Sequence, residues 1–468
     1  MRHTRETRAR HRGLAQPGPA DLSAATRVGL TAASVGIIYG YDLSCIAGAL
    51  LFIADDFGLT TQQQELLTTT AVVGQIAGAL AAGPLANAIG RKKSMVLITL
   101  GYAVFALLGA SAVSMPMLLV ARLLLGLTIG VSVVVVPVYI AESAPAAVRG
   151  SLSAAYQLTT VSGVVLGYLS GYFLAGSHSW RWILGLAAVP ATLLLPLLLR
   201  MPDTARWYVL KGRIEDARRA LLRIEPAADV NTELAEIASA VGEESGGAVA
   251  EMLRRPYLRA TGFVIALGFL MQITGINAII YYSPRLFAAM GFTGDFALLV
   301  LPALVQVGGL AAVCAALFLV DRLGRRPILL SGIATMLVAD VVLIAVFANG
   351  LAQGGIGPVL GFIGVLLFII GFDFCFGSLV WVYAGESFPS RLRSLGSSTM
   401  LTSNLVGNAI VAAVFLTMLQ TLGGAGSFAV FGLFTAVSFA VMYRFAPETK
   451  GRQLEEIRHF WENGGRWP

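Results

Sequence analysis

One short motif occurs twice in the chain, as YIAESAPAAVR at residues 139–149 and as YAGESFPSRLR at residues 383–393. Tyr, Glu, Ser, Pro and Arg keep the same offsets in the two copies, which begin about 245 residues apart. A basic turn precedes each copy, at residues 90–93 and 324–326, and a Pro-acid-Thr tripeptide follows, at residues 202–204 and 447–449. Three markers in one order and at nearly one offset predict an internal duplication into two homologous halves.

The composition predicts that both halves lie in a membrane. The chain is 56% hydrophobic and 13% charged, and a soluble domain carries roughly twice that charged fraction. Apolar stretches of about twenty residues, each long enough to cross a bilayer, recur about six times before Pro202 and about six times after Arg255. We therefore expect an all-α integral membrane protein with twelve transmembrane helices in two pseudo-symmetric six-helix halves, an arrangement common in transporters.

The hydrophilic segments set the expected boundaries. The longest lies in the middle of the chain and contains an amphipathic helical pattern at residues 213–224. From N- to C-terminus we expect a basic cytoplasmic tail, a six-helix half, a cytoplasmic helical linker, a second six-helix half and a cytoplasmic tail, at residues 1–25, 26–200, 201–257, 258–446 and 447–468.

The basic residues behind the net charge of +7 are concentrated in alternate loops of the chain. Lys and Arg crowd both termini, the two basic turns and the central linker, whereas the intervening loops carry almost none. This alternation predicts cytoplasmic termini in a plasma or inner membrane. The basic residues are therefore interpreted as setting the orientation in the membrane and attracting anionic lipid, and not as binding nucleic acid. The three cysteines have no metal-ligand spacing, so we expect no metal and no cofactor, and we expect a monomer in the lipid bilayer.

Two charged residues within predicted spans are candidates for ion coupling. Asp42 lies in the first span, about 22 Å from its cytoplasmic end, and Arg122 lies near the outer end of the fourth. Both therefore occupy the outer half of the bilayer, where they can pair. A carboxylate in a cavity that alternates between hydrated and closed states can load and release a proton. The alternative is a static ion pair that joins two helices.

Two further acids fall within predicted spans. Asp340 lies near the outer end of the ninth span, where we expect it to face water. Asp373 lies deeper, among phenylalanines of the tenth span. It is interpreted either as an acceptor that faces substrate or as a second titrating site.

Uncharged polar and aromatic residues in several spans predict a neutral ligand rich in hydroxyl groups. Amides donate to and accept from hydroxyls, and an aromatic ring packs on the C–H face of a sugar. The alternative is hydrogen bonding between helices. The candidates are Gln157, Gln272, Asn277, Tyr281, Trp381, Asn404 and Asn408.

Over nearly its whole length the chain resembles a sugar porter of the major facilitator superfamily. The resemblance rests on seven motifs in order, at residues 40–42, 83–91, 137–150, 202–207, 275–282, 321–327 and 447–451. It implies two halves that rock around a central sugar site. In proton-linked members of the family a first-helix aspartate pairs with a fourth-helix arginine, which matches Asp42 and Arg122.

The resemblance also implies roles for other residues. The family's sugar contacts map onto the seven uncharged candidates named above. A cytoplasmic gate, whose charges close the two halves against each other on the inside, maps onto Arg91, Glu142, Arg149, Asp321, Arg325, Glu386 and Arg393.

Several positions depart from the family pattern. Met271 replaces the first of two usual glutamines, Gly309 an asparagine, and Leu405 a tryptophan. Gly377 and Ser378 stand where a glycine-proline kink is usual, and Asn87 replaces an acid in the first basic turn. The site thus offers fewer hydrogen bonds and more apolar surface than a typical hexose site. This widens the expected ligands to pentoses, polyols such as inositol, deoxy-sugars and amphipathic molecules.

The function predicted from the sequence is import of a sugar or polyol, coupled to protons by alternating access. A facilitative uniporter of the same fold is the alternative. A sensor that does not transport is disfavoured by the short tail after Gly451. An enzyme is disfavoured because the linker shows no nucleophile–base pair, metal spacing or phosphate loop.

Overall fold

The structure is a computed structural model that describes residues 19–176, 179–224, 230–243, 248–254, 257–350, 355–452 and 454–463. Within these residues, twelve helices are long and apolar enough to cross a membrane. They are built from α2 (Pro19–Ala33), α3 (Gly36–Phe57), α4 (Thr61–Ile89), α5 (Arg91–Ala110), α6 (Met115–Ser143), α7 (Ala146–Ala175), α8 (Trp180–Leu186), α9 (Ala188–Leu199), α14 (Tyr257–Ile273), α15 (Ile276–Tyr281), η1 (Phe296–Val300), α17 (Leu301–Leu323), α18 (Arg325–Ala348), α19 (Gly357–Phe372), η3 (Asp373–Gly377), α20 (Ser378–Glu386), α21 (Ser390–Thr421) and α22 (Gly423–Phe445).

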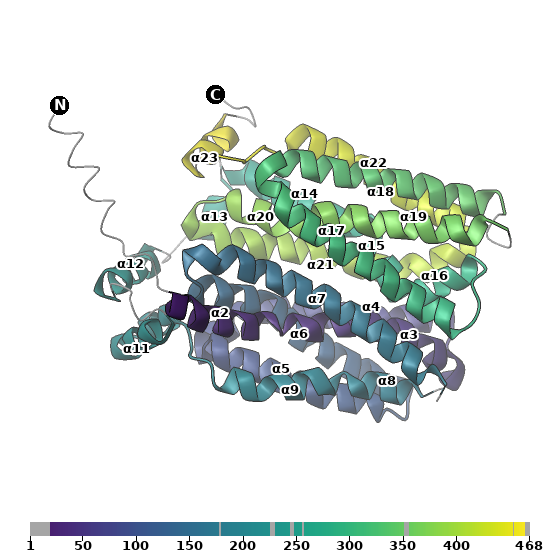
Figure 1. The fold of residues 1–468 in the computed structure, drawn as a ribbon, viewed down its shortest axis with the longest axis horizontal. Helices are drawn as coiled ribbons and strands as arrows, with labels where there is room; N and C mark the ends of the chain where they lie inside the picture. Colours follow the sequence, from purple (N-terminus) through teal and green to yellow (C-terminus); the bar gives the residue numbers. More distant parts are fainter. Residues whose placement is uncertain are drawn as a thin grey trace.

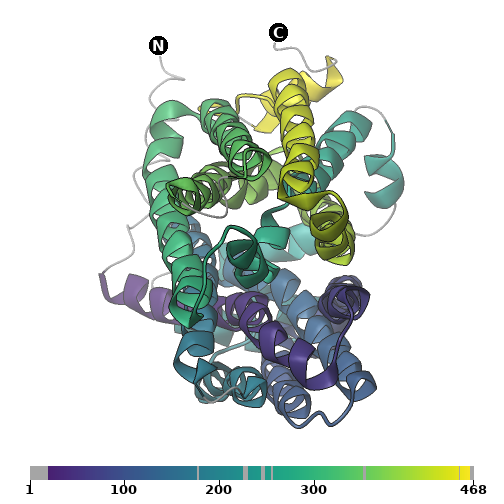
Figure 2. The ribbon, with the colours of Figure 1, turned by 90° about the vertical axis from the view of Figure 1, so that its right-hand side faces the viewer.

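The helices form two bundles that lie side by side (Figure 1). Helices α2 to α9 occupy the lower side of that view and α14 to α22 the upper side, and the view along the helices shows the same division (Figure 2). We call these the first and second halves. The short helix α16 (Ser283–Ala289) continues the seventh span.

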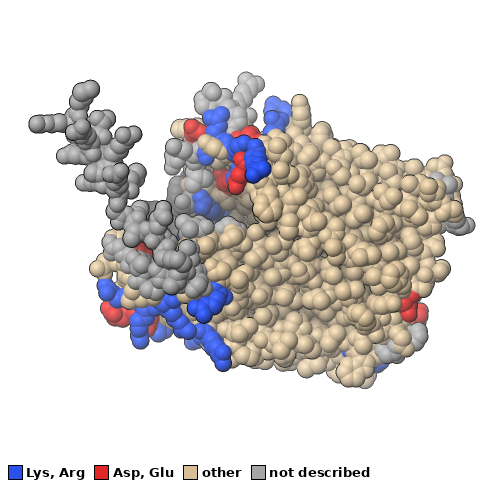
Figure 3. Space-filling view, in the orientation of Figure 1, with Lys and Arg blue, Asp and Glu red and all other residues tan. Residues whose placement is uncertain are grey.

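One end of the bundle carries the start of α2 and the hydrophilic helices, and we call it the linker end. These helices are α10 (Ala205–Leu210), α11 (Ile214–Ile224), α12 (Val230–Glu243), α13 (Ala248–Met252) and α23 (Leu454–Glu462). Lys and Arg side chains gather at this end, while uncharged residues cover the side of the bundle (Figure 3). The opposite end is called the far end.

Small residues allow the helices of the first half to pack backbone against backbone. A Cβ atom at Gly126 of α6 would collide with the carbonyl oxygen of Ala71, and one at Gly130 would collide with that of Gln75, both in α4. Close approach of this kind favours association of membrane helices, which lack a hydrophobic driving force between them. The glycines of the fourth span therefore fix its contact with the second.

The seventh span is broken at its centre. Gly275 adopts φ of 98°, which favours glycine, and separates α14 from α15. The helical pattern is interrupted again before Pro284, nine residues further on, because Pro284 has no N–H to donate to the carbonyl of Ile280. That carbonyl instead accepts a 2.6 Å hydrogen bond from Tyr168 Oη of the first half.

The tenth span changes from α-helix to π-helix at η3, between α19 and α20. Short π-helical turns inside membrane helices often occur at functional sites. The break at Gly275 and the π-helical turn η3 both lie beside the central cavity described next. Broken helices at a central site are common in transporters with repeated halves.

Candidate substrate and ion-coupling site

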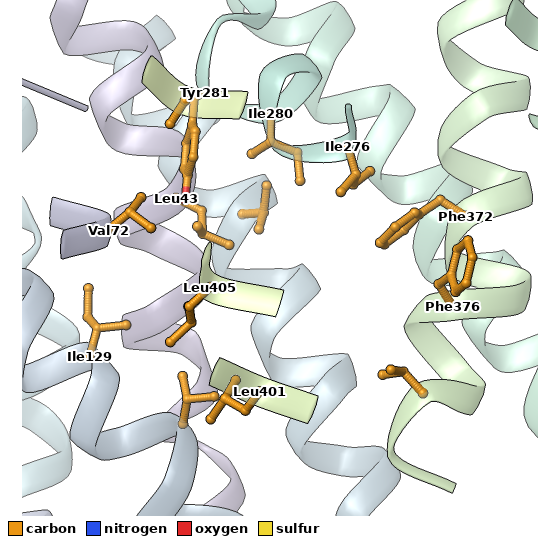
Figure 4. Packing of buried hydrophobic residues seen from close by; sticks show 14 of the residues in the cluster. Leu43, Val72, Ile129, Ile276, Ile280, Tyr281, Phe372, Phe376, Leu401 and Leu405 are labelled. Atoms are coloured by element: carbon orange, nitrogen blue, oxygen red, sulfur yellow. The ribbon is translucent and has the colours of Figure 1, made fainter. Parts of the chain in front are cut away.

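A cavity of about 120 Å³ lies between the two halves. A water molecule occupies about 30 Å³ in the liquid, so the space holds roughly four waters or one small molecule. Part of its wall is apolar and includes Leu43, Ile276, Ile280, Phe372 and Leu401, which surround an open space in the close view (Figure 4).

The structure brings most of the predicted substrate residues to this cavity. From the first half comes Gln157 on α7. From the second half come Gln272, Asn277, Asp373, Trp381 and Asn404. Carboxamide groups from both halves thus face one space, as binding at the interface of two repeats requires.

Tyr281 and Asn408 lie outside the cavity lining. Asn408 Nδ2 donates a 3.1 Å hydrogen bond to Tyr281 Oη, and both side chains are buried. The bond joins α15 to α21. In this conformation the two residues connect helices, which was the alternative interpretation of the polar cluster.

Sequence reasoning missed three further polar lining residues. Gln306 of α17 lies one turn before Gly309, and Tyr39 and Tyr156 come from the first half. A glutamine inside an apolar span was a usable signal for Gln306. No local pattern distinguished the two tyrosines from aromatic residues that only pack.

The departures from the family pattern have visible consequences at this site. Met271 Sδ lies 3.3 Å from Asn404 Nδ2, while Gln272 Nε2 donates to Asn404 Oδ1 over 3.3 Å. At Gly309, a Cβ atom would collide with Asp373 Oδ2. The missing side chain of the eighth span therefore leaves the space that the Asp373 carboxylate occupies.

Asp42 and Arg122 form a buried ion pair beside the cavity. Arg122 Nη1 donates to Asp42 Oδ1 over 2.8 Å, and the two side chains are only 2% and 3% exposed. Within the described chain, Arg122 Nε has no hydrogen-bond partner. The neighbours of Asp42 on α3 at residues 39 and 43 line the cavity, so the pair lies directly behind the cavity wall.

The expectation that Asp340 faces water is wrong. Its side chain is 1% exposed and lies between α18 and α22, where Thr435 Oγ1 donates to Asp340 Oδ2 over 2.9 Å. Within the described residues Oδ1 has no partner. Position along a span gave its depth, but the rotation of the helix toward α22 decided its exposure.

At the linker end of the first half, the repeated markers meet in one charged network. Arg91 Nε lies 3.0 Å from Glu142 Oε2, and Thr204 Oγ1 donates to the same oxygen over 2.6 Å. Asp203 Oδ1 accepts the backbone N–H groups of Arg91 and Lys92 at 3.0 and 3.3 Å. A carboxylate thus caps the N-terminus of α5, where free N–H groups favour an anion.

The second half repeats this network with its own residues. Glu448 accepts the backbone N–H groups of Arg325 and Arg326 at 3.0 and 3.1 Å and caps α18. Arg325 also lies 3.2 Å from Asp321 and 3.5 Å from Glu386. The duplication seen in the sequence therefore extends to individual contacts.

These predicted gate residues pair within their own halves in this conformation. Arg91 and Glu142 pair in the first half, and Arg325 pairs with Asp321 and Glu386 in the second. Arg393 packs near Gly385 of the same half. The side chain of Arg149 lies outside the described residues.

The two halves are hydrogen-bonded to each other at the far end. Glu65 of α4 accepts from both the N–H and the Oγ1 of Thr417 on α21, each over 2.7 Å. Gln420 Nε2 donates to Thr61 Oγ1 over 2.6 Å. Together with the bond from Tyr168 to α15, these contacts join the two halves toward the far end.

Two six-helix halves around a central polar cavity define a polytopic membrane transporter. The chain belongs to the sugar (and other) transporter family, which matches residues 28–461. It is therefore a multi-pass membrane protein of sugar transport and not an enzyme, as its sequence predicted.

Curated relatives and solved structures support this family assignment and the fold. The chain is 35% identical to the galactose-proton symporter of Escherichia coli K12 over 91% of this chain and 92% of that protein. It is 34% identical to the arabinose-proton symporter of the same strain, over 92% of each. The fold matches the major facilitator superfamily proton:xylose symporter XylE bound to 6-bromo-6-deoxy-D-glucose, with a TM-score of 0.79 and 24% identity over 94% of this chain and 99% of that one. These matches confirm the predicted twelve-helix fold.

Proposed function

We propose that this transporter imports a sugar or related polyol together with protons, by alternating access of the central cavity. The observation that carries the proposal is the buried pair of Asp42 and Arg122 beside that cavity. The relatives named for proton symport of galactose and arabinose support the same mechanism.

Neutralising one member of the buried pair leaves the other as an unpaired charge. Protonation of Asp42 removes the countercharge of Arg122, and an uncompensated buried charge costs several kcal/mol. That cost is relieved when the guanidinium reaches water, which favours a conformation with a hydrated cavity. A static lock would be expected to satisfy the remaining donors of the arginine, whereas Arg122 Nε has no partner within the described residues.

The orientation follows from charge. The linker end carries the basic residues (Figure 3), so we assign it to the cytoplasm and the far end to the outside of the cell membrane. The described conformation then has its outer end closed by Glu65 and Thr417, with the gate charges paired within each half. In the outward-facing state we expect these charges to pair across the halves. Residues 26–200 and 258–446 would act as the two rocking units of a monomer.

Uptake into proteoliposomes tests the proposal. A labelled panel of glucose, galactose, xylose, arabinose and inositol is supplied with and without an inward proton gradient, with the membrane potential clamped. Accumulation above equilibrium that requires the gradient supports symport and identifies the substrate. Equilibration that ignores the gradient would assign the facilitative alternative, and no uptake of any sugar would refute the proposed substrate class.

A further inference from the structure

Asp373 presents a carboxylate to the central cavity. It begins η3, the π-helical turn of the tenth span, and its side chain is buried with 6% of the residue exposed. The carboxylate lies against two glycines, Gly309 of α17 and Gly377 one turn along its own span. A Cβ atom at Gly309 would collide with it, and one at Gly377 would lie 2.8 Å from Oδ1.

This carboxylate has no counterion in the described protein. The described residues make no hydrogen bond or ion pair with its oxygens, and those that line the cavity include no Lys, Arg or His. Arg122, the buried cation beside the cavity, is bound to Asp42. By contrast, Asp340, which is also buried, accepts from Thr435 and does not line the cavity. A carboxylate that faces the cavity without a partner from the described protein is free to pair with a cationic group of the ligand.

We propose that the preferred substrate is an amino sugar whose protonated amine binds Asp373. This inference rests on the proposed function and names the substrate class of the same site. The aromatic side chains of Tyr39, Tyr156, Phe372 and Trp381 line the cavity as well, and aromatic faces attract ammonium groups. Gln157, Gln272 and Asn277 remain to bind the ring hydroxyls. A neutral sugar of the same shape leaves the carboxylate without a cation.

The test compares ligands that differ in one group. Calorimetric binding of glucosamine, galactosamine, glucose, galactose and the uncharged N-acetylglucosamine is measured on the purified full-length protein at pH 6.5, where sugar amines are protonated. A charge-assisted hydrogen bond predicts that the free amino sugars bind about ten- to a hundredfold more tightly than the matching neutral sugars.

Two substitutions locate the effect. Asp373→Asn removes the charge at nearly constant shape, so it should lower the affinity for each amino sugar to that for the matching neutral sugar. Asp340→Asn removes the other buried carboxylate of the second half and should keep the preference. The comparison of ligands on the wild-type protein decides the proposal even if Asp373→Asn does not fold.

The possible failures are distinguishable. Binding of neutral sugars at equal or higher affinity than amino sugars would overturn the inference and leave the proposed function standing. A preference for amino sugars that survives in Asp373→Asn would also overturn it, because another group would then recognise the amine. Absence of binding by every sugar would overturn both proposals.

Discussion

Replacing Asp42 and Arg122 singly and together separates proton coupling from structural locking. The pair is 2.8 Å apart with side chains 3% and 2% exposed, so removing one partner leaves a buried charge. Asp42→Asn should destabilise the protein by about 3–5 kcal/mol, and the double variant Asp42→Asn, Arg122→Gln should recover most of that loss because no net charge stays buried.

Proton-driven transport should not recover in the double variant, although its stability does. In liposomes with a pH gradient of two units and a clamped potential, the gradient stores about 2.7 kcal/mol per proton, which supports roughly hundredfold accumulation at one proton per sugar. We expect wild-type protein to accumulate substrate toward this limit. The single and the double variants should only equilibrate it, since neither contains the carboxylate that carries the proton.

The control is a surface ion pair of the same half. Asp56 lies 3.4 Å from Arg181, and their side chains are 54% and 44% exposed. Asp56→Asn should therefore change stability by less than about 1 kcal/mol and leave accumulation unchanged. Gradient-dependent accumulation by the double variant would refute the reasoning and make the buried pair a structural lock.

Four further substitutions test the packing and the contacts at the far end. Gly126→Ala pushes a methyl group into the backbone of α4 and should cost about 1–3 kcal/mol, whereas Gly83→Ala, which meets no atom within 4 Å, should be neutral or stabilising by thermal unfolding in detergent. Asp203→Asn weakens the cap of α5 and should lower stability by about 0.5–2 kcal/mol in the same assay. Glu65→Gln weakens the bonds to Thr417 and should increase labelling, from the far side, of a cysteine placed in the cavity of a cysteine-free background. Unchanged labelling would show that Glu65 does not hold that end closed.

The predictions from sequence succeeded where the signal is local or repeated. Hydropathy over about twenty residues fixes a span because backbone groups in a bilayer can be satisfied only within a helix or a closed sheet. The duplication predicted two halves of the same fold, and the pairs of Arg91 with Glu142 and of Arg325 with Glu386 lie at equivalent positions in them. Asp42 and Arg122 were matched by depth, and opposite charges at one depth in a low dielectric are strongly driven to pair.

Tertiary structure decided what depends on helix rotation and on neighbouring side chains. Asp340 is buried because its face of α18 turns toward Thr435, and Tyr281 lies off the cavity because it binds Asn408. The sequence contained both Gly309 and Asp373 but not their contact, since spans far apart in the chain meet only after packing. The amino acids alone thus determined a two-half sugar transporter and its buried ion pair. Which polar groups line the cavity, and where the two halves are joined, were decided only by how the twelve spans rotate and pack against one another.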